Sequence, residues 1–366
     1  MQLIAERNRL SEAITNASKA TATNSSISAL EGILLALKGN TLTVTGYDLE
    51  IGIKNMIRVE GKEDGEIVLN ARLLGEMIKK MPTGFPISIS TTNDTSVLIK
   101  CGSVEFNIVG VSGKNYPNIP ELDLETSFKI KENVLKSMIR QTIFAAATNE
   151  VKPILQGTLF EITDKQLRVV CVDGIRVARR VEKVDYRDLS FVAPAGTLNE
   201  LLRILSDEET GKDITVNIER NQIGFYRDDY MIISRLLDGE YIDYNRFINF
   251  TPTMEAIVNA REFAAALDRA ILLTEKFKSP VVCTMEKDTL FVTCNTNLGS
   301  INDKIKIKYG YEKMEIAFNA RIMMDALRNT ECDEVKLLFT TPIAPIKIVP
   351  LGEEDFTFLV LPVRVK

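Results

Sequence analysis

The sequence contains no histidine. This absence excludes Ser-His-Asp and Cys-His catalytic arrangements, and it removes the commonest general base near neutral pH and the commonest metal ligand. The sequence also lacks the GxxxxGKS/T and GxGxxG patterns of phosphate-binding loops. The acidic clusters "RDDY" at 227–230 and "GEED" at 352–355 fall between strand-like runs, as solvated turn residues do. We therefore expect no catalytic residue, no metal and no cofactor.

Cysteines are few, scattered and never spaced as CxxC, which predicts reduced, buried thiols and neither a disulfide framework nor a zinc cluster. No run approaches the roughly 18 apolar residues of a membrane span. The opening "MQLIAERNRL" carries charges where a secretory signal has its apolar stretch. These features predict a cytoplasmic protein with no membrane contact. The cysteines are Cys101, Cys171, Cys283, Cys294 and Cys332.

The chain is long and mildly acidic. Its 366 residues exceed one ordinary core and suggest two or three domains. Hydrophobic residues make up 45% and charged residues 26%, as in globular proteins. The formal net charge is −5, so any nucleic-acid role requires a local basic face.

One junction recurs along the chain. "LNAR" at 69–72 returns as "FNAR" at 318–321, and "FVAPAGTLNELLRIL" at 191–205 has the same plan of apolar strand, small-residue turn and helical spacing. The junctions near residues 70, 195 and 319 give a period of about 124 residues. The asparagine of the two NAR copies stands where a side chain caps a helix N-terminus.

Three other kinds of segment keep this period. Helix-like openings occupy 5–20, 131–147 and 260–273, strand–turn–strand units occupy 41–53, 166–180 and 289–303, and closing strands occupy 103–110, 229–236 and 356–365. Strands in hairpin-like succession with few helices predict an α+β chain of three repeated domains, each with antiparallel sheets and two helices. Proline and polar residues place the domains at 1–122, 123–250 and 251–366.

The predicted helices carry a positive excess. Six helical windows hold fourteen Lys or Arg and eight Asp or Glu, a balance of +6 that leaves −11 for the rest of the chain. Solvated helix faces explain any single charge. If all the helices share one side of a curved array, they form a mildly basic surface that contacts phosphates without reading bases.

The sequence resembles the bacterial sliding clamps, the beta subunits of DNA polymerase III. The resemblance runs from "LTVTGYDLEIGI" through "KPILQGTLFE" and "VVCVDGIRVARR" to "LVLPVRVK", with "DGIRVA" (173–178) and "DGEYIDYNRF" (238–247) the most specific stretches. It implies a non-catalytic, DNA-binding processivity factor: a head-to-tail homodimer that closes into a ring around duplex DNA. A loader that uses ATP opens the ring, and the DNA polymerase III alpha subunit, other polymerases and repair proteins bind to it.

The resemblance also implies a pocket for partner peptides between the second and third domains. Aliphatic walls would bury the peptide, and Arg176, Arg246 and Arg364 could bond its carbonyl or acidic groups. A plain edge strand is the alternative explanation of the C-terminal residues. The matching positions are Leu155, Val172, Gly174, Ile175, Arg176, Val177, Ile242, Arg246, Phe247, Phe277, Asn319, Ile322, Ile343, Pro345, Leu359, Val360, Leu361, Pro362, Val363 and Arg364.

Two further sets follow from the resemblance. The expected subunit contact pairs Phe106 and Ile108 on an edge strand with Ile271 and Leu272, although core packing also explains all four. The positions expected to face DNA are Asn24, Arg72, Lys79, Lys80, Arg140, Asn149, Lys152 and Arg203.

The chain departs from the family at three places. Ile242 stands where proline is frequent, Val365 and Lys366 follow Arg364, and the uncharged Asn24 replaces a basic residue. From the residues alone, two other classes stay open. One is an enzyme using carboxylate or Lys/Tyr chemistry, which purified turnover would reveal. The other is a monomeric scaffold that binds no DNA, which sedimentation would reveal.

Overall fold

The computed structural model describes residues 1–92, 95–123, 127–148, 152–208, 211–274 and 280–364. The chain forms two compact units, of which unit 1 contains Met1–Asn133 with Arg203–Leu236 and unit 2 contains Val134–Leu202 with Leu237–Lys366. The middle repeat therefore contributes strands to both units. Within the described residues, every helix is too short or too polar to cross a membrane.

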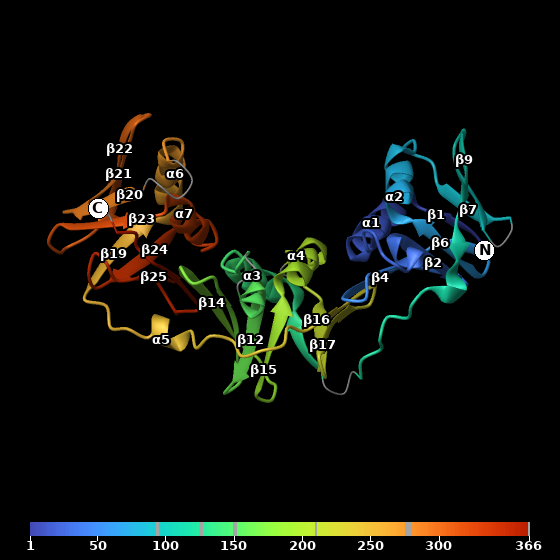
Figure 1. The fold of residues 1–366 in the computed structure, drawn as a ribbon, viewed down its shortest axis with the longest axis horizontal. Helices are drawn as coiled ribbons and strands as arrows, with labels where there is room; N and C mark the ends of the chain where they lie inside the picture. The colour runs from blue at the N-terminus through green and yellow to red at the C-terminus, as the bar shows by residue number, and fades with distance from the viewer. Residues whose placement is uncertain (93–94, 124–126, 149–151, 209–210, 275–279, 365–366) are drawn as a thin grey trace. The chain divides into compact units, whose positions relative to one another are not determined.

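Unit 1 contains two antiparallel sheets (Figure 1). The first has the order β10-β6-β2-β3-β4-β18-β17-β16-β11, and the second has the order β5-β1-β7-β8-β9. The strand bounds are β1 (Gln2–Ala5), β2 (Gly32–Lys38), β3 (Thr41–Tyr47), β4 (Ile51–Arg58), β5 (Glu60–Glu63), β6 (Gly65–Asn70), β7 (Ile87–Thr91), β8 (Ser96–Cys101), β9 (Val104–Val109), β10 (Val111–Ser112), β11 (Ser127–Lys131), β16 (Asp213–Glu219), β17 (Gln222–Arg227) and β18 (Tyr230–Arg235).

Two helices of unit 1 bury one apolar face each. In α1 (Arg7–Ala17), Leu10 and Ile14 are four residues apart and fully buried, as are Leu74 and Ile78 in α2 (Ala71–Lys80). The Asn70 side chain accepts a hydrogen bond from the backbone N–H of Leu73 at 2.9 Å, which confirms the predicted cap. Short 3-10 turns occupy 18–20, 28–31 and 113–115.

Unit 2 contains one continuous antiparallel sheet with the order β15-β12-β13-β14-β26-β25-β24-β19-β22-β21-β20-β23 (Figure 1). Its strands are β12 (Gly157–Thr163), β13 (Gln166–Val172), β14 (Arg176–Lys183), β15 (Leu189–Pro194), β19 (Met254–Asn259), β20 (Val281–Glu286), β21 (Thr289–Thr296), β22 (Gly299–Lys308), β23 (Met314–Phe318), β24 (Glu334–Phe339), β25 (Ile346–Pro350) and β26 (Phe356–Val360). Its helices are α3 (Glu132–Ile143), α4 (Ala195–Ile204), α5 (Asn245–Ile248), α6 (Ala260–Ile271) and α7 (Ala320–Arg328), with a 3-10 turn at 153–156. The first two residues of α3 and the last two of α4 belong to unit 1.

The helix starts of unit 2 differ from one another. Asn319 caps α7 by accepting from the N–H of Arg321 at 3.1 Å, and Asn259 caps α6 in the same way. Pro194 precedes α4, and because proline has no hydrogen-bonding side chain, the middle repeat lacks this cap. The predicted closing strand at 356–365 is also shorter than expected, since β26 ends at Val360.

The three predicted repeats share one hairpin. Two-residue turns join β2 to β3, β12 to β13 and β20 to β21, so that Thr41, Gln166 and Thr289 are equivalent positions. Each turn also accepts a backbone hydrogen bond from farther along its repeat: Val59 to Asn40 at 2.9 Å, Val184 to Lys165 at 2.9 Å and Ile307 to Asp288 at 3.0 Å. The predicted threefold repeat of antiparallel sheets is confirmed.

Strand pairing joins neighbouring repeats at two seams. At the first seam β4 pairs with β18, and Ile53 lies opposite Ile232. At the second seam β14 pairs with β26, and Ala178 lies opposite Phe358. In both, the second strand of a strand–turn–strand unit pairs with the closing strand of the following repeat.

Candidate partner-binding site and other interaction surfaces

The β13–β14 turn is built on Asp173. One carboxylate oxygen accepts from the backbone N–H groups of Ile175 and Arg176, each at 3.0 Å, and the other accepts from Arg176 Nε at 2.8 Å. Arg176 Nη1 also donates to Asp325 at 3.0 Å, and its guanidinium lies 5.5 Å from the centre of the Phe144 ring. Only 14% of the Arg176 side chain is exposed. Arg176 therefore ties the turn to α7, and its charge is already balanced by two carboxylates.

The segment after β26 is held from two sides. Leu361 N–H donates to the Ile175 carbonyl at 3.0 Å, and Val363 N–H donates to the Ala317 carbonyl at 2.7 Å. Pro362 between them has no N–H to satisfy. These bonds fix residues 361–363 between the turn of the middle repeat and the end of β23 in the third repeat.

The apolar residues predicted for the pocket are brought together beneath this segment. Leu155, Val172, Val177 and Leu359 are buried in one cluster, and Ile242 packs against it. Val360 belongs to the adjoining core of unit 2, against which Ile322 packs. The sequence prediction therefore found side chains that the fold gathers along the second seam.

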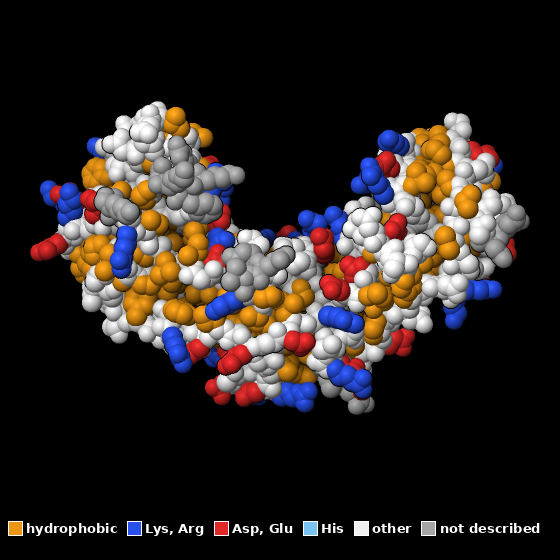
Figure 2. Space-filling model, viewed as in Figure 1, with side chains coloured by type: hydrophobic (Ala, Val, Ile, Leu, Met, Phe, Trp, Pro, Cys, Tyr) orange, Lys and Arg blue, Asp and Glu red, His pale blue; other side chains and the backbone are white. Residues whose placement is uncertain are grey.

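Several other predicted members expose apolar surface. The exposed fractions of Ile175, Phe247, Ile343, Leu361 and Val363 are 44%, 43%, 70%, 38% and 40%. Hydrophobic side chains also gather on the viewed face of unit 2, over the region of β14 and β25 (Figure 2). A stable chain gains nothing from keeping so much apolar surface in water, so this region is suited to burying a partner.

The remaining predicted members are polar, glycine or proline, apart from one phenylalanine. Arg246 is exposed and pairs with Asp243 at 2.9 Å, and Arg364 is exposed. Gly174 has φ +93°, Asn319 caps α7 and Pro345 is half-buried. Phe277 lies outside the described residues.

The residues predicted to face DNA include several that interact with acids. Arg72 pairs with Glu76 at 3.3 Å on α2, and Arg140 pairs with Glu331. Lys79, Lys80, Lys152 and Arg203 are exposed, as is Asn24, which has φ +62°. Asn149 lies outside the described residues. Carboxylates thus offset part of the positive excess counted from the sequence.

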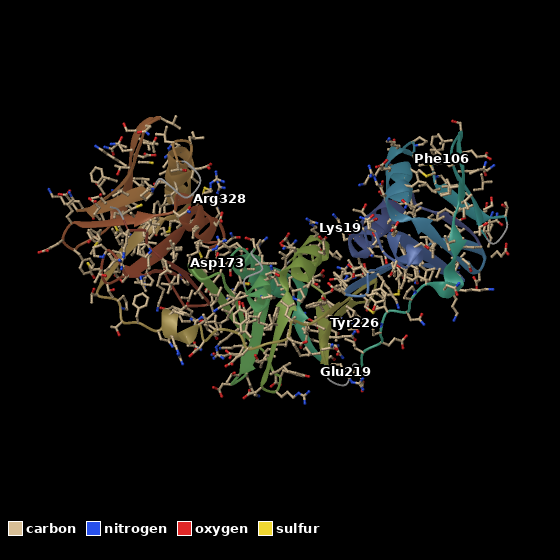
Figure 3. The ribbon with its side chains drawn as sticks, in the orientation of Figure 1. Lys19, Phe106, Asp173, Glu219, Tyr226 and Arg328 are labelled. Carbon is tan, nitrogen blue, oxygen red and sulfur yellow. The ribbon has the colours of Figure 1, made fainter. Side chains whose placement is uncertain are left out.

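The residues predicted for the subunit contact lie on an edge strand of unit 1 and at the end of a helix of unit 2. Phe106 and Ile108 lie on β9, the last strand of its sheet, and are half-buried against the core of unit 1. Figure 3 shows the position of Phe106 on this strand. Ile271 packs against the core of unit 2, and Leu272 at the end of α6 is 80% exposed.

Sequence reasoning missed two exposed residues near these edges. Val109 at the end of β9 is 82% exposed, and Leu298 in the β21–β22 turn is 72% exposed. With Leu272 and Ile343, they are the four most exposed large apolar side chains in the described part of the chain. The alternation of β9 could have indicated Val109, because residues 105, 107 and 109 share its outer face.

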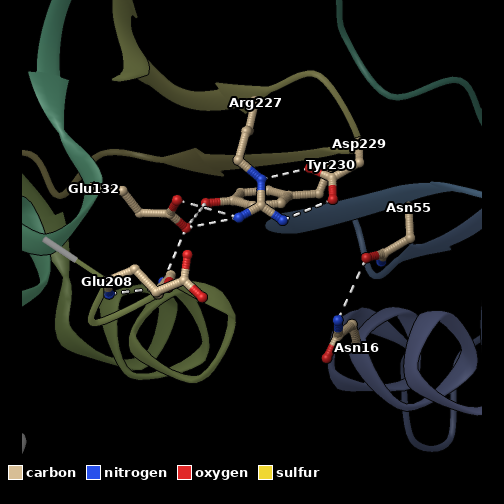
Figure 4. A network of polar contacts seen from close by, with 8 residues as sticks. Asn16, Asn55, Glu132, Glu208, Arg227, Asp229 and Tyr230 are labelled. Atoms are coloured by element: carbon tan, nitrogen blue, oxygen red, sulfur yellow. Dashed lines mark hydrogen bonds and ion pairs between the residues drawn. The ribbon is translucent and has the colours of Figure 1, made fainter. Parts of the chain in front are cut away.

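Sequence reasoning also missed an ionic network in unit 1 (Figure 4). Glu132 is 2% exposed and accepts from Arg227 Nη1 at 2.9 Å, from Tyr230 Oη at 3.3 Å and from the N–H of Ser206 at 3.0 Å. Arg227 also pairs with Asp229. Burial, followed by the nearby Glu132 charge, raises the pKa of Tyr230. The two acids of the "RDDY" cluster, Asp228 and Asp229, are exposed as expected of turn residues, whereas Arg227 and Tyr230 beside them belong to the internal network.

Family models match almost the whole chain. The N-terminal domain of the DNA polymerase III beta subunit matches residues 1–120, the central domain matches 129–243 and the C-terminal domain matches 249–364. These matches follow the order of the three repeats seen in the structure.

Individual relatives agree with the models. The beta sliding clamp of Bacillus subtilis is 31% identical over 379 residues, with both chains fully covered. The crystal structure of the DNA polymerase sliding clamp from Bacillus subtilis gives a TM-score of 0.91 at 30% identity, again with full coverage of both chains. A sliding clamp from Pseudomonas aeruginosa bound to griselimycin shares the fold, with a TM-score of 0.92 at 23% identity and full coverage. The chain thus belongs to the DNA polymerase III beta subunit family, the bacterial sliding clamps, which are non-catalytic processivity factors.

Proposed function

We propose that two copies of this chain join head to tail into a ring around duplex DNA, and that partner proteins dock at the second seam. The observation that carries the ring is the strand pairing between repeats. Two of the three strand–turn–strand units pair with the next closing strand through β4–β18 and β14–β26. In the described residues the third unit pairs with no closing strand of this kind, and we assign its partner strand to a second copy.

The two strands that would form this contact, β9 and β22, each have a stretch of edge that pairs with no other strand in the described residues. In the described residues, β9 pairs with β8 alone, and Gly299–Lys306 of β22 pairs with β21 alone. A heterologous contact of this kind closes a ring of six repeats if each repeat turns the path by about 60°. The apolar residues Phe106, Ile108, Ile271 and Leu272 would be covered by that contact.

A ring holds DNA by enclosing it, so tight phosphate binding is unnecessary and would oppose sliding. The excess charge on the helices would contact phosphates weakly and without sequence preference. We assign this role to Asn24, Arg72, Lys79, Lys80, Arg140, Asn149, Lys152 and Arg203. Because these groups act together, Lys80→Ala alone should change DNA retention little.

We assign partner docking to the positions that the resemblance implies: Leu155, Val172, Gly174, Ile175, Arg176, Val177, Ile242, Arg246, Phe247, Phe277, Asn319, Ile322, Ile343, Pro345, Leu359, Val360, Leu361, Pro362, Val363 and Arg364. Their exposed apolar surface supports the assignment. The expected occupants are short segments of the DNA polymerase III alpha subunit, the clamp loader, other polymerases and repair proteins. A sliding clamp from Pseudomonas aeruginosa is bound to griselimycin, and we propose that this compound binds the present chain at the second seam and take it as the probe. We further propose domains at 1–122, 123–250 and 251–366 and a cytoplasmic location, because the partner is the bacterial chromosome.

Retention on circular DNA tests the ring directly. The protein is loaded onto nicked circular DNA with its clamp loader and ATP and passed through gel filtration. We expect it to co-elute with the circle and to be released once the circle is linearised. Equal retention on both forms would show that enclosure is not the binding mode.

Truncation tests docking separately from the ring. Removal of residues 362–366 should abolish binding of griselimycin while the dimer, measured by sedimentation, stays intact. Unchanged griselimycin binding by this variant would contradict the docking assignment.

A further inference from the structure

We propose that a cavity at the first seam binds an adenine ribonucleotide, with the base at one end and the phosphate at the other. The cavity has a volume of about 700 Å³ and lies between α1, the end of β4 and the β17–β18 turn. Its size is within the range of small-molecule sites. All of its walls belong to unit 1 of a single chain, so the proposal does not depend on the ring.

The cavity is separate from the residues assigned to partner docking. At the first seam, β4 and β18 are antiparallel, with Ile51 opposite Ser234 at one end and Asn55 opposite Tyr230 at the other. The end near Ile51 corresponds to the docking turn of the second seam. Asn55 and Tyr230 line the cavity, which therefore lies at the far end of the seam from that position.

Asn55 supplies an unsatisfied donor to the cavity. Its side chain is 7% exposed, and its Oδ1 accepts from Asn16 Nδ2 at 3.4 Å (Figure 4). Its Nδ2 has no hydrogen-bond partner among the described residues. A buried donor without a partner is unfavourable, so a ligand that accepts from Nδ2 would be bound in part by removing that cost.

A carboxamide at this place favours adenine among the bases. A single carboxamide can donate to adenine N7 and accept from the exocyclic N6. Asn55 has its Nδ2 free for the first bond, and its Oδ1 keeps a second lone pair beside the bond from Asn16. The side chains of Ala13, Met56 and Ile57 also line the cavity and offer apolar contact to a flat ring.

Two exposed arginines lie at the other end of the cavity. Arg9 precedes Asn16 by seven helical residues, about 10.5 Å along α1. Arg58 follows Asn55 by three strand residues, about 10 Å along β4. Arg58 also lines a neighbouring cavity together with Arg7, which places it beside the N-terminal end of α1. A ligand that reaches from the asparagines to the arginines therefore spans about 10 Å.

The charges on the walls leave Arg58 available for a phosphate. Within the described residues Arg58 forms no ion pair, whereas Arg227 is already held by two carboxylates. Arg9 pairs with Glu6 at 3.2 Å, and both side chains are more than half exposed. An exposed pair of this kind contributes little, so Arg9 can exchange its partner for a phosphate.

Two acids define the rest of the ligand. Glu12 and Asp228 line the cavity and are exposed. Glu12 lies between Arg9 and Asn16 on α1, so it would face the ribose of a nucleotide that spans the cavity. A carboxylate accepts hydrogen bonds from ribose hydroxyls, as it does in dinucleotide sites. Because both acids oppose further negative charge, the expected ligand carries one phosphate.

Titration calorimetry of the full chain with 5′-AMP tests the site. We expect a Kd below about 1 mM. Adenosine lacks the phosphate and 5′-CMP lacks the adenine edge, so each should bind at least fivefold more weakly. The DNA unit 5′-dAMP should bind at least threefold more weakly, because it has one hydroxyl fewer for Glu12. No binding of 5′-AMP would overturn the site, and equal binding of 5′-dAMP would overturn the choice of a ribonucleotide.

Two variants divide the ligand between the ends of the cavity. Arg58→Gln should weaken 5′-AMP binding at least tenfold and leave adenosine binding unchanged, because it removes a charged donor to the phosphate alone. Asn55→Leu should weaken both at least tenfold, because it removes the contacts to the base. The matched control is Lys62→Gln, which removes an exposed cation of unit 1 outside the cavity and should change neither.

The outcomes separate a built site from weak attraction to positive charge. Equal weakening of 5′-AMP by Arg58→Gln and Lys62→Gln would overturn the proposal, as would equal weakening of 5′-AMP and adenosine by Arg58→Gln. Urea unfolding checks that the variants are folded. Should Asn55→Leu fail to fold, Arg58→Gln still decides, since its side chain is exposed.

Discussion

The two seams within the chain have the same backbone construction. At each, a tyrosine in the segment that leads to the next repeat packs beneath the seam, buried at Tyr116 and half-buried at Tyr241, and its hydroxyl donates to backbone carbonyls. Tyr116 Oη lies 3.4 Å from both of its acceptors, and Tyr241 Oη lies 3.3 and 3.5 Å from its two. The acceptors are Gly32 and Thr45 at the first seam and Gly157 and Val170 at the second. A repeated frame therefore carries both seams.

The side chains on that frame differ. The first seam has the charged residues Glu50 and Arg235 at the positions where the second seam has Ile175 and Leu361. All four are exposed, so the backbone sets their location and the side-chain chemistry decides what they can bind. Only the second seam offers apolar surface at these two positions, which is why docking is proposed there.

The largest expected effect comes from giving the second seam the charges of the first. Ile175→Glu with Leu361→Arg should weaken griselimycin binding at least about tenfold, or ~1.4 kcal/mol, because the variant removes apolar contact surface and a ligand would have to desolvate the two charged groups. Titration calorimetry measures the change.

The control makes the reverse change at the first seam. Glu50→Ile should leave griselimycin affinity unchanged while sedimentation confirms a dimer for both variants. If the second-seam variant binds as tightly as the parent, the exposed apolar residues there do not form the docking site.

The next effect concerns the ion pair that only the second seam has. Arg176 is equivalent to Ile51, and both Arg176 and Asp173 are 14% exposed. Arg176→Met should lower the free energy of unfolding by about 1–3 kcal/mol, since a largely buried carboxylate loses its partner. Arg246 and Asp243 provide the matched control, with the same spacing and a 2.9 Å contact but an arginine that is 81% exposed.

We expect Arg246→Met to cost less than about 0.5 kcal/mol, because exposed ion pairs contribute little. Urea unfolding followed by circular dichroism measures both variants. Equal losses would show that burial does not distinguish the two pairs.

The repeats were predictable from the sequence, and the seams were not. The phase of the strand–turn–strand units and the NAR junctions follows from local apolar patterns, which are enough to predict the hairpins and the caps at Asn70 and Asn319. Pairing between β4 and β18 depends on contacts between residues about 180 positions apart in the sequence, and no local pattern encodes it. The division of the middle repeat between two units has the same origin.

The candidate site was found through the family resemblance, because its residues are scattered from Leu155 to Arg364. Local sequence gives them no common signal. Leu298 and Val109 were missed for a related reason. An exposed leucine in a turn looks ordinary until the free strand edge beside it is known.

A smaller effect separates the turns of the two seams. Leu49 and Gly174 occupy equivalent positions and both have positive φ, +78° and +93°. A leucine in this region is strained by about 1–2 kcal/mol, whereas glycine is not. Gly174→Leu should therefore lower the free energy of unfolding by that amount. Leu49→Gly removes the strain but also adds conformational freedom to the unfolded chain, so it should raise the free energy of unfolding by less than about 1 kcal/mol. Opposite signs in urea unfolding are the expected result, and two losses would contradict it.

The smallest effect tests what the seams share. Tyr116→Phe and Tyr241→Phe should each lower the free energy of unfolding by about 1 kcal/mol, since each removes one hydroxyl group and its hydrogen bonds. Burial raises the pKa of both hydroxyls, so both stay protonated in the folded chain while the unfolded chain loses these protons near pH ~10. The contribution of these two hydroxyls to stability should thus be constant below that pH and fall above it, so each variant should lose stability less steeply than the parent. Unfolding measured at pH 8 and pH 11 checks the slopes, and a variant as steep as the parent would mean that its tyrosine already ionises in the folded chain.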